Sequence, residues 1–300
     1  MRVLAAIDFG PGTDLVLSIA ARRARESRGE LGVCHVFAAS RPLHVLFPER
    51  ELPTVGAIPG VAIEARAALE ATVARVLGAN ADVTLFLEEG EPYAEVVRRA
   101  EEWKAELVVV AGRTARGIFA SLIGGVAERI VRYAPCPVIV ARCLREHGRV
   151  LAATDLSDPS LPAVTAGWAE ARLRGGGLTI LHVVPLVPMV SGSAPGAPPM
   201  AITPETMSAI EASTRSVFES RLATLLAPLQ REEQPLEATR EIVVGPPAAM
   251  IVAHARSVDA ELVVVGTRGR TGLARVVLGS VAEDVVRTAE CSVMVVRLAG

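Results

Sequence analysis

Three glycines and a serine near the carboxyl end of the sequence have the types and spacing needed to hold a phosphate group. Two residues separate Gly266 from Gly269, and Gly279 and Ser280 follow after nine more. Glycine lets the main chain approach an anion closely, and a hydroxyl beside free helix N–H groups adds further donors. Ser280 and Glu283 also form a capping box, S-x-x-E, which would stabilise a helix start without any ligand. On spacing alone, the capping box is the favoured explanation.

The glycine loop lies between a predicted strand and a predicted helix. Leu262–Val265 is a short β-branched run, which is typical of a strand buried on both faces. After Ser280, apolar residues recur at helical spacing as far as Ala289. This order would place the unpaired N–H groups of the first helical turn at the loop, together with the positive end of the helix dipole.

The sequence repeats itself, and the repeat predicts the architecture. Ala105–Val110 recurs letter for letter as Ala260–Val265, and Val3–Ala6 recurs as Val150–Ala153. Each half alternates strand-like runs with helical stretches, which favours a parallel sheet covered by helices. The expected strands are Arg2–Ile7, Gly32–Phe37, Asp82–Glu88, Glu106–Ala111 and Pro137–Ala141, then Arg149–Thr154, Gly177–Val184, Glu237–Val244, Glu261–Gly266 and Ser292–Arg297. We therefore expect two domains, residues 1–147 and 148–300.

Two proline-rich stretches interrupt the repeated pattern. Residues 40–60 carry four prolines, and residues 185–204 carry six. Neither stretch suits a helix interior, so we expect both to be long loops that follow the second strand of each half. A lid over a ligand and a connection without a role are both open interpretations.

The composition excludes several classes of function. Hydrophobic residues make up 51% of the chain, and the net charge is −2, so no overall field favours nucleic acid as a partner. The single lysine, Lys104, does not follow a glycine loop, which excludes a P-loop nucleotidase. The four cysteines show no C-x-x-C spacing and are expected to be buried thiols rather than metal ligands. No apolar run reaches the ~18 residues of a membrane span, so we expect no membrane partner and a cytoplasmic location.

The motif G-x2-G-x9-G-[ST] after a VVVG strand resembles the nucleotide loop of the universal stress protein family, and all four of its positions match. The resemblance covers both halves of the chain. It implies two tandem α/β domains, each an open-twisted parallel sheet of five strands that is Rossmann-like and adenine nucleotide alpha hydrolase-like. It also implies ATP at the carboxyl ends of the strands, where open parallel sheets generally bind ligands.

The resemblance assigns further residues to the nucleotide. Asp155 matches the family acid that contacts the nucleoside, with Thr154 beside it. Val183 matches a position whose backbone reaches the adenine, and Val281 follows the motif serine in the first helical turn. Read locally, Asp155 could instead be a turn acid at a strand end, and Val183 a plain core residue.

Two arginines in the loop are candidates for contacts with phosphate. Arg270 and Arg268 carry planar guanidinium groups, which suit phosphate oxygens. Loop arginines are also commonly just solvated, and Arg270 is the stronger candidate of the two. No set of metal ligands is visible, although Mg²⁺ could arrive on the phosphates.

The first half departs from the motif. Aligned on the shared AELVVV segment, its counterparts of the first two motif glycines are Ala111 and Thr114, and that of the serine is Gly125. The added Cβ atoms stand where backbone should approach phosphate, and the hydroxyl is gone. We therefore expect the first half not to bind ATP, or to bind it much more weakly, and to act as a packing partner.

The expected function is ATP binding by the second domain in a stress-response or regulatory role. We predict no catalytic residues and no metal ligands, and we interpret His35 and His182, which lie at matching strand ends, as structural. A nucleotide-independent interaction scaffold and a slow ATP hydrolase remain alternatives. The resemblance also implies that the two halves pair through their closing strands as a pseudo-dimer, and it leaves room for a homodimer.

Overall fold

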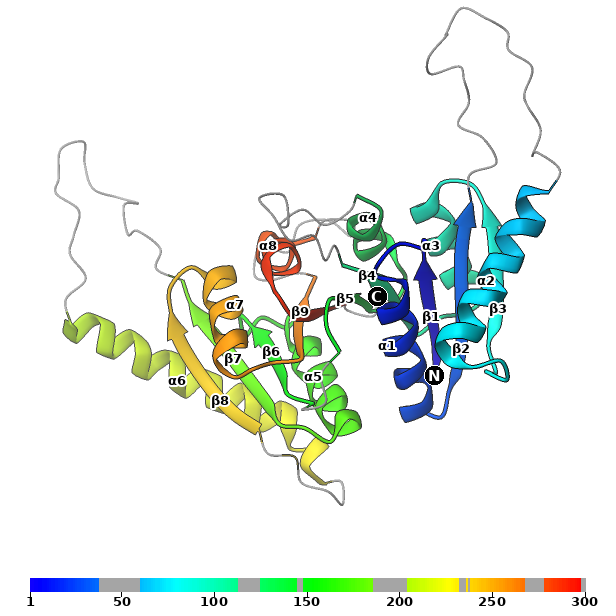
Figure 1. Cartoon of the computed structure of the whole chain (residues 1–300). Coiled ribbons are helices and arrows are strands. Elements are labelled where there is room, and N and C mark those ends of the chain that lie inside the picture. The colour runs from blue at the N-terminus through cyan, green and yellow to red at the C-terminus, as the bar shows by residue number, and fades with distance from the viewer. Residues whose placement is uncertain are drawn as a thin grey trace, which may run out of the picture. The chain divides into compact units, whose positions relative to one another are not determined.

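The computed structural model describes residues 1–37, 60–112, 125–144, 148–185, 204–231, 236, 238–267 and 278–297. The chain divides into two compact units, Met1–Arg145 with Glu290–Val295, and Glu146–Ala289 with Val296–Gly300. Each unit is a layered α/β structure (Figure 1). Both proline-rich stretches expected to be loops fall almost wholly outside the described residues, so neither prediction is tested.

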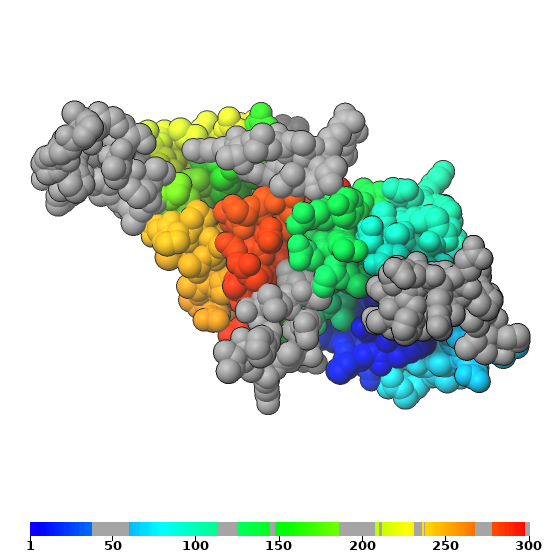
Figure 2. Space-filling view, turned by 90° about the horizontal axis from the view of Figure 1, so that it is seen from above, coloured from blue at the N-terminus to red at the C-terminus, as the bar shows by residue number. Residues whose placement is uncertain are grey.

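The first unit contains a sheet with the strand order β3-β2-β1-β4-β5-β10. Its strands are β1 (Arg2–Ile7), β2 (Glu30–Phe37), β3 (Thr84–Glu89), β4 (Leu107–Ala111), β5 (Val138–Ala141) and β10 (Ser292–Val296). Its helices are α1 (Thr13–Glu26), α2 (Val61–Leu77), α3 (Pro92–Glu102) and α4 (Gly125–Tyr133). The helices α1 and α2 pack together over one face, and α3 and α4 pack together over the other, as Figure 1 and Figure 2 show.

The second unit repeats this plan with the strand order β9-β6-β7-β8. Its strands are β6 (Val150–Thr154), β7 (Leu178–Val184), β8 (Ala238–Val244) and β9 (Leu262–Gly266). Its helices are α5 (Leu161–Arg174), α6 (Pro204–Leu226), α7 (Pro247–Ser257) and α8 (Ser280–Thr288), with a short 3₁₀ turn η2 (Leu229–Arg231). Figure 2 shows α7 and α8 side by side at the surface, where they pack together.

The central strands are apolar because helices cover the sheet on both faces. The first four residues of β4 and of β9 are buried, and each strand ends on a half-buried small residue, Ala111 or Gly266. The pairings β1–β2, β1–β4, β6–β7 and β6–β9 are all parallel. The carboxyl ends of these strands therefore meet at one edge of each sheet, and this edge is where the predicted site residues must gather.

The strand β10 pairs antiparallel with β5, so the sheet of the first unit is mixed rather than wholly parallel. Val293 pairs with Val140, and Met294 pairs with Ile139. The hydroxyl of Ser292 accepts the main-chain N–H of Arg142 at 3.1 Å and donates to the carbonyl O of Cys143 at 3.0 Å. The last strand of the chain is thereby fixed to the fifth strand of the first unit.

Candidate functional site

The residues predicted to hold a nucleotide lie at the carboxyl edge of the second sheet wherever the structure describes them. Asp155 follows β6, Val183 lies near the end of β7, and Gly266 is the last residue of β9. Gly279 is the N-cap of α8, while Ser280 and Val281 are its first two residues. Gly269 and the two loop arginines lie outside the described residues.

Backbone hydrogen bonds hold the two ends of the glycine loop together. The N–H of Gly279 donates to the carbonyl O of Thr267 at 2.9 Å, and the N–H of Thr267 donates to Val296 O at 2.9 Å. A Cβ added to Gly279 would stand 3.3 Å from Thr267 O, tighter than an ordinary contact. The start of α8 is therefore drawn to the end of β9, and glycine suits this close approach.

The structure contradicts the capping-box explanation of Ser280, because Ser280 is not the N-cap residue of α8. The N-cap is Gly279, with φ −63° and ψ 145°, and no side chain caps the helix. The first hydrogen bond within the helix runs from the N–H of Glu283 to Gly279 O at 2.9 Å. An α-helix leaves the N–H groups of its first turn without intrahelical partners, so those of α8 open toward the strand ends. Ser280 and Val281 are exposed there.

The turn after β6 uses Thr154 and Asp155 as structural groups. Thr154 Oγ1 accepts the N–H of Leu156 at 3.0 Å and lies 2.7 Å from Ser160 Oγ. Asp155 Oδ1 accepts the N–H of Ser157 at 3.0 Å, and the Ser157 hydroxyl also donates to it. Thr154 is buried, and both its hydroxyl and its carbonyl O are hydrogen-bonded, so we assign it to positioning the turn. The Asp155 carboxylate is half-buried at the carboxyl edge of the sheet.

The backbone conformation that shapes this turn was not predicted from the sequence. Leu156 has φ 64°, which is left-handed and uncommon for leucine. The first repeat has the same feature at the matching position, where Phe9 has φ 59° and Asp8 Oδ1 accepts the N–H of Gly10 at 2.9 Å. Neither residue is a glycine or asparagine, so no single letter marks the turn. The signal that could have found it is the recurrence of an acid followed by a large apolar residue in both repeats.

The strand β7 reaches beyond β6. Their pairing ends at Thr154 and His182, so Val183 and Val184 continue past the last residue of β6 while pairing with β8 on the other side. The backbone of Val183 therefore borders the space above β6, although its side chain is only 7% exposed. In this position Val183 could contact a ligand through its main chain but not through its side chain.

The two matching histidines have structural roles. The Nδ1–H of His182 donates to the carbonyl O of Thr154 at 2.8 Å, and that of His35 donates to Ile7 O at 2.9 Å. Both side chains are buried, and their rings lie near Phe218 and Phe9 respectively. Each histidine thus fixes the end of the central strand in its repeat, as the sequence interpretation expected.

The thiol of Cys34 is not reactive. Cys34 is fully buried in β2, and burial raises the pKa of its thiol from 9.0 to about 12, with nearby Glu88 adding to the effect. Because the thiolate is the reactive form, this residue is inert at neutral pH. None of the four cysteines, all of which are among the described residues, forms a disulfide.

No helix among the described residues combines the length and the apolar character that crossing a bilayer requires.

The comparisons with known proteins agree with the duplicated fold. A model described as the universal stress protein family matches residues 1–142 and again residues 146–297. A universal stress protein of Mycolicibacterium smegmatis is 30% identical over 98% of this chain and 96% of its own length. Universal stress protein Rv2005c of Mycobacterium tuberculosis is 34% identical over 65% of this chain, and the match spans only 62% of that protein.

A solved structure shares the whole architecture. The crystal structure of a functionally unknown protein from Pseudomonas aeruginosa PAO1 superimposes with a TM-score of 0.67. The superposition covers 98% of this chain and 92% of the other, at 20% sequence identity. At this identity the similarity establishes the fold alone.

Proposed function

Because the chain belongs to the universal stress protein family, we propose that its second repeat binds ATP and that binding serves a stress-response or regulatory role. The observation that carries the proposal is the convergence of separately predicted residues. Asp155, Gly266 and Ser280 come from three elements and share one sheet edge. The bond from Gly279 to Thr267 holds the helix start against that edge.

Each residue then has a distinct task toward the nucleotide. The unpaired N–H groups at the start of α8 and the Ser280 hydroxyl donate to phosphate oxygens. The Asp155 carboxylate accepts hydrogen bonds from the nucleoside, and the backbone of Val183 borders the adenine. Gly269 and Arg270 complete the phosphate end of the proposed site, and Mg²⁺ accompanies the phosphates.

The proposal keeps residues 1–147 and 148–300 as the two domains and gives ATP only to the second. It also includes a pseudo-dimer of the two repeats through their closing strands, and a cytoplasmic location. The pairing of β10 with β5 inside the first unit supports this use of the closing strands. Small-angle scattering that shows two separated bodies would contradict the pseudo-dimer.

The first test measures equilibrium binding of ATP by calorimetry. Wild type should bind one ATP per chain, and Gly269→Val should weaken binding by at least about 100-fold, since a side chain enters the space meant for phosphate. Thr114→Val is the matched control, because Thr114 is the first-repeat counterpart of Gly269. If the wild-type protein does not bind ATP, the proposed function is wrong and a nucleotide-independent interaction scaffold is favoured. Equal losses in both variants would show that the loop assignment is wrong.

A second test separates binding from helix capping at Ser280. If the hydroxyl served as a cap, Ser280→Ala would lower the free energy of unfolding by about 0.5–2 kcal/mol. No side-chain cap is present, so we expect unchanged stability together with ATP binding that is weaker by about tenfold. Urea unfolding and calorimetry on the same preparation measure the two quantities. Lost stability with unchanged affinity would contradict the assignment.

A further inference from the structure

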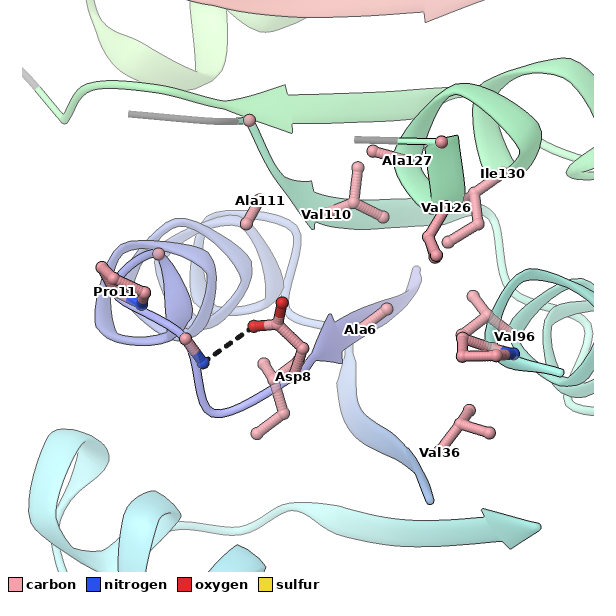
Figure 3. A pocket seen from close by; sticks show the side chains of 16 residues that line it. Ala6, Asp8, Pro11, Val36, Val96, Val110, Ala111, Val126, Ala127 and Ile130 are labelled. Atoms are coloured by element: carbon pink, nitrogen blue, oxygen red, sulfur yellow. Dashed lines mark hydrogen bonds between the residues drawn. The ribbon is translucent and has the colours of Figure 1, made fainter. Parts of the chain in front are cut away.

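The first repeat contains a preformed cavity at the position that matches the proposed ATP site of the second. Its volume is about 580 Å³, and it lies at the carboxyl ends of β1 and β4, between the starts of α1 and α4. Figure 3 shows the side chains that line it, with Val36, Val96, Val126 and Ile130 forming an apolar wall. This size lies within the range of cavities that hold small organic ligands.

Asp8 is the only charged side chain among the described residues that line this cavity. In Figure 3 its carboxylate points into the space, and Oδ1 accepts the N–H of Gly10 at 2.9 Å. A Cβ on Gly10 would come within 2.9 Å of that oxygen, so glycine keeps the carboxylate in this orientation. An ionised carboxylate only accepts hydrogen bonds, and its two oxygens have further lone pairs for a ligand that donates them.

The cavity lacks the features that suit a phosphate chain. No described lining residue is a lysine or arginine, and the one charged group is an acid, which repels anions. Ala111 occupies the place that Gly266 has in the second repeat, and its Cβ would be 2.7 Å from a Cβ on Gly12. The hydroxyl of Ser280 has no counterpart, because Gly125 occupies that position.

The other half of the proposed site is retained. Asp8 matches Asp155, and Val36 matches Val183, each at the same place in its repeat. The pairing of β1 with β2 ends at Ile7 and His35, so Val36 extends past β1 as Val183 extends past β6. The groups assigned to the nucleoside are therefore present in both repeats. Of the side-chain and glycine positions assigned to the phosphates, Gly269, Arg270 and Ser280 are replaced in the first repeat by Thr114, Ala115 and Gly125.

We propose that the cavity of the first repeat binds an uncharged nucleoside, with sugar hydroxyls donating to Asp8 and the base against the apolar wall. The choice of a nucleoside rests on the proposed function, because the roles of Asp8 and Val36 follow from their counterparts. The selection against phosphate rests on the described lining of the cavity, whose one charged side chain is an acid, and on the replaced motif residues. One chain would thus carry two sites of different selectivity, one for the triphosphate and one for its phosphate-free form.

The test uses the full chain with Gly269→Val and Asp155→Ala together, which disable the phosphate part and the nucleoside part of the proposed ATP site, and adenosine as the probe. Calorimetry should show one adenosine per chain and no binding of ATP. Asp8→Asn should weaken adenosine at least about tenfold, because the acceptor loses its charge. Val126→Trp should block the cavity, and it is tolerable because Val126 is 42% exposed. Both changes, made without Gly269→Val and Asp155→Ala, should leave ATP binding by the second repeat intact, which shows that the variants fold.

A ligand change gives an independent reading of the same contact. 2′,3′-Dideoxyadenosine should bind the Asp8-containing protein as weakly as adenosine binds Asp8→Ala, and Asp8→Ala, which has no side-chain acceptor, should bind both ligands equally. Adenosine binding that ignores Asp8→Asn and Val126→Trp would overturn the site, and ATP binding by the chain with Gly269→Val and Asp155→Ala would overturn the selectivity. Wild type that binds ATP once but never adenosine after these two changes overturns this inference alone. Wild type that never binds ATP overturns the proposed function instead.

Discussion

Gly12 and Ala111 face each other where α1 begins beside the end of β4. A Cβ on Gly12 would approach the Cβ of Ala111 to 2.7 Å, which no side-chain adjustment could relieve. At the matching positions the second repeat has Pro159 and Gly266. The residue at the helix start therefore has the side chain in the second repeat, and the residue at the strand end has it in the first. The glycine that the nucleotide motif requires at the end of β9 thus also has a packing explanation. The exchange of small residues couples the motif to the start of the first helix in each repeat.

This coupling predicts a rescue. Gly12→Ala should destabilise the protein by about 1–3 kcal/mol, because an extra methyl overfills a close contact. Adding Ala111→Gly should recover part of that loss, so that the double variant loses less free energy of unfolding than the two single variants together. Urea unfolding of the four proteins measures the coupling energy. Strict additivity would mean that the two residues do not compete for the same space.

A buried hydroxyl in the first repeat lacks the partner that its counterpart has. Thr13 Oγ1 is buried and has no hydrogen-bond partner in the part of the chain that the structure describes, whereas Ser160 Oγ at the matching position bonds with Thr154 Oγ1. The reason is that Ile7 replaces Thr154 in the first repeat, and isoleucine offers no oxygen. An unsatisfied buried donor costs free energy that a bonded donor does not.

Opposite effects on stability follow at these two matched positions. Thr13→Val should stabilise the protein by about 1 kcal/mol, because it removes a buried hydroxyl that has no partner. Ser160→Ala should destabilise it by about 1–2 kcal/mol, because it leaves Thr154 without that bond. Thermal and urea unfolding check both signs. A loss of stability in Thr13→Val would show that the hydroxyl has a partner in solution.

Among the elements, α5 is joined to the start of β9 by buried charges. Arg174 lies 3.2 Å from Glu170 and also contacts Glu261, and all three side chains are at most 4% exposed. Two carboxylates share one guanidinium group in this cluster. Removing the cation would leave buried negative charges uncompensated, which is more costly than losing an exposed pair.

The corresponding prediction compares two arginines of the same unit. Arg174→Met should lower the free energy of unfolding by about 3–5 kcal/mol, since it breaks a buried ionic cluster. Arg287→Ala is the control, because its pairing with Asp284 is exposed and should contribute less than about 1 kcal/mol. Chemical unfolding of both variants gives the comparison. Similar small losses would show that water reaches the cluster around Arg174.

The strands and helices were largely predictable, because the spacing of the apolar residues and the internal repeat of the sequence indicate the same elements. The strand Arg2–Ile7 was predicted with its observed bounds, and β9 begins one residue after the predicted start at Glu261. The site residues were predicted to share an edge, and those that the structure describes do so. The bonding of Thr154 and the left-handed Leu156 were not predictable, because they depend on turn geometry that the letters do not fix. The strand β10 was predicted to within one residue, at Ser292–Arg297, but the antiparallel sense of its pairing with β5 was not, because an apolar run does not state its direction relative to a neighbour.

For the whole molecule, duplication has produced two repeats whose edges have diverged in chemistry while their frames remain alike. The histidine bond to the end of the central strand and the left-handed turn residue occur in both repeats. The complete glycine and serine motif occurs only in the second, because the first repeat keeps just Gly124 at the position of Gly279. The frame is therefore common to both repeats, whereas the residues of the glycine motif differ between them.

The attachment of β10 to β5 makes a prediction at this scale. A chain ended after Ala289 lacks β10 and should expose the edge of β5. Amide hydrogen exchange in Val138–Ala141 should then accelerate at least about tenfold, while β1 keeps its protection. A chain ended after Arg297 serves as the control because it retains β10. Unchanged protection of β5 in the shorter chain would show that β10 does not cover it in solution.

The same attachment constrains how the protein is made. A ribosome releases β5 long before it releases β10, because all the residues between Ala141 and Ser292 are translated in the interval. At the usual rates of elongation this takes on the order of ten seconds. Throughout that time the nascent chain carries a bare apolar strand edge, open to chaperones and to neighbouring nascent chains.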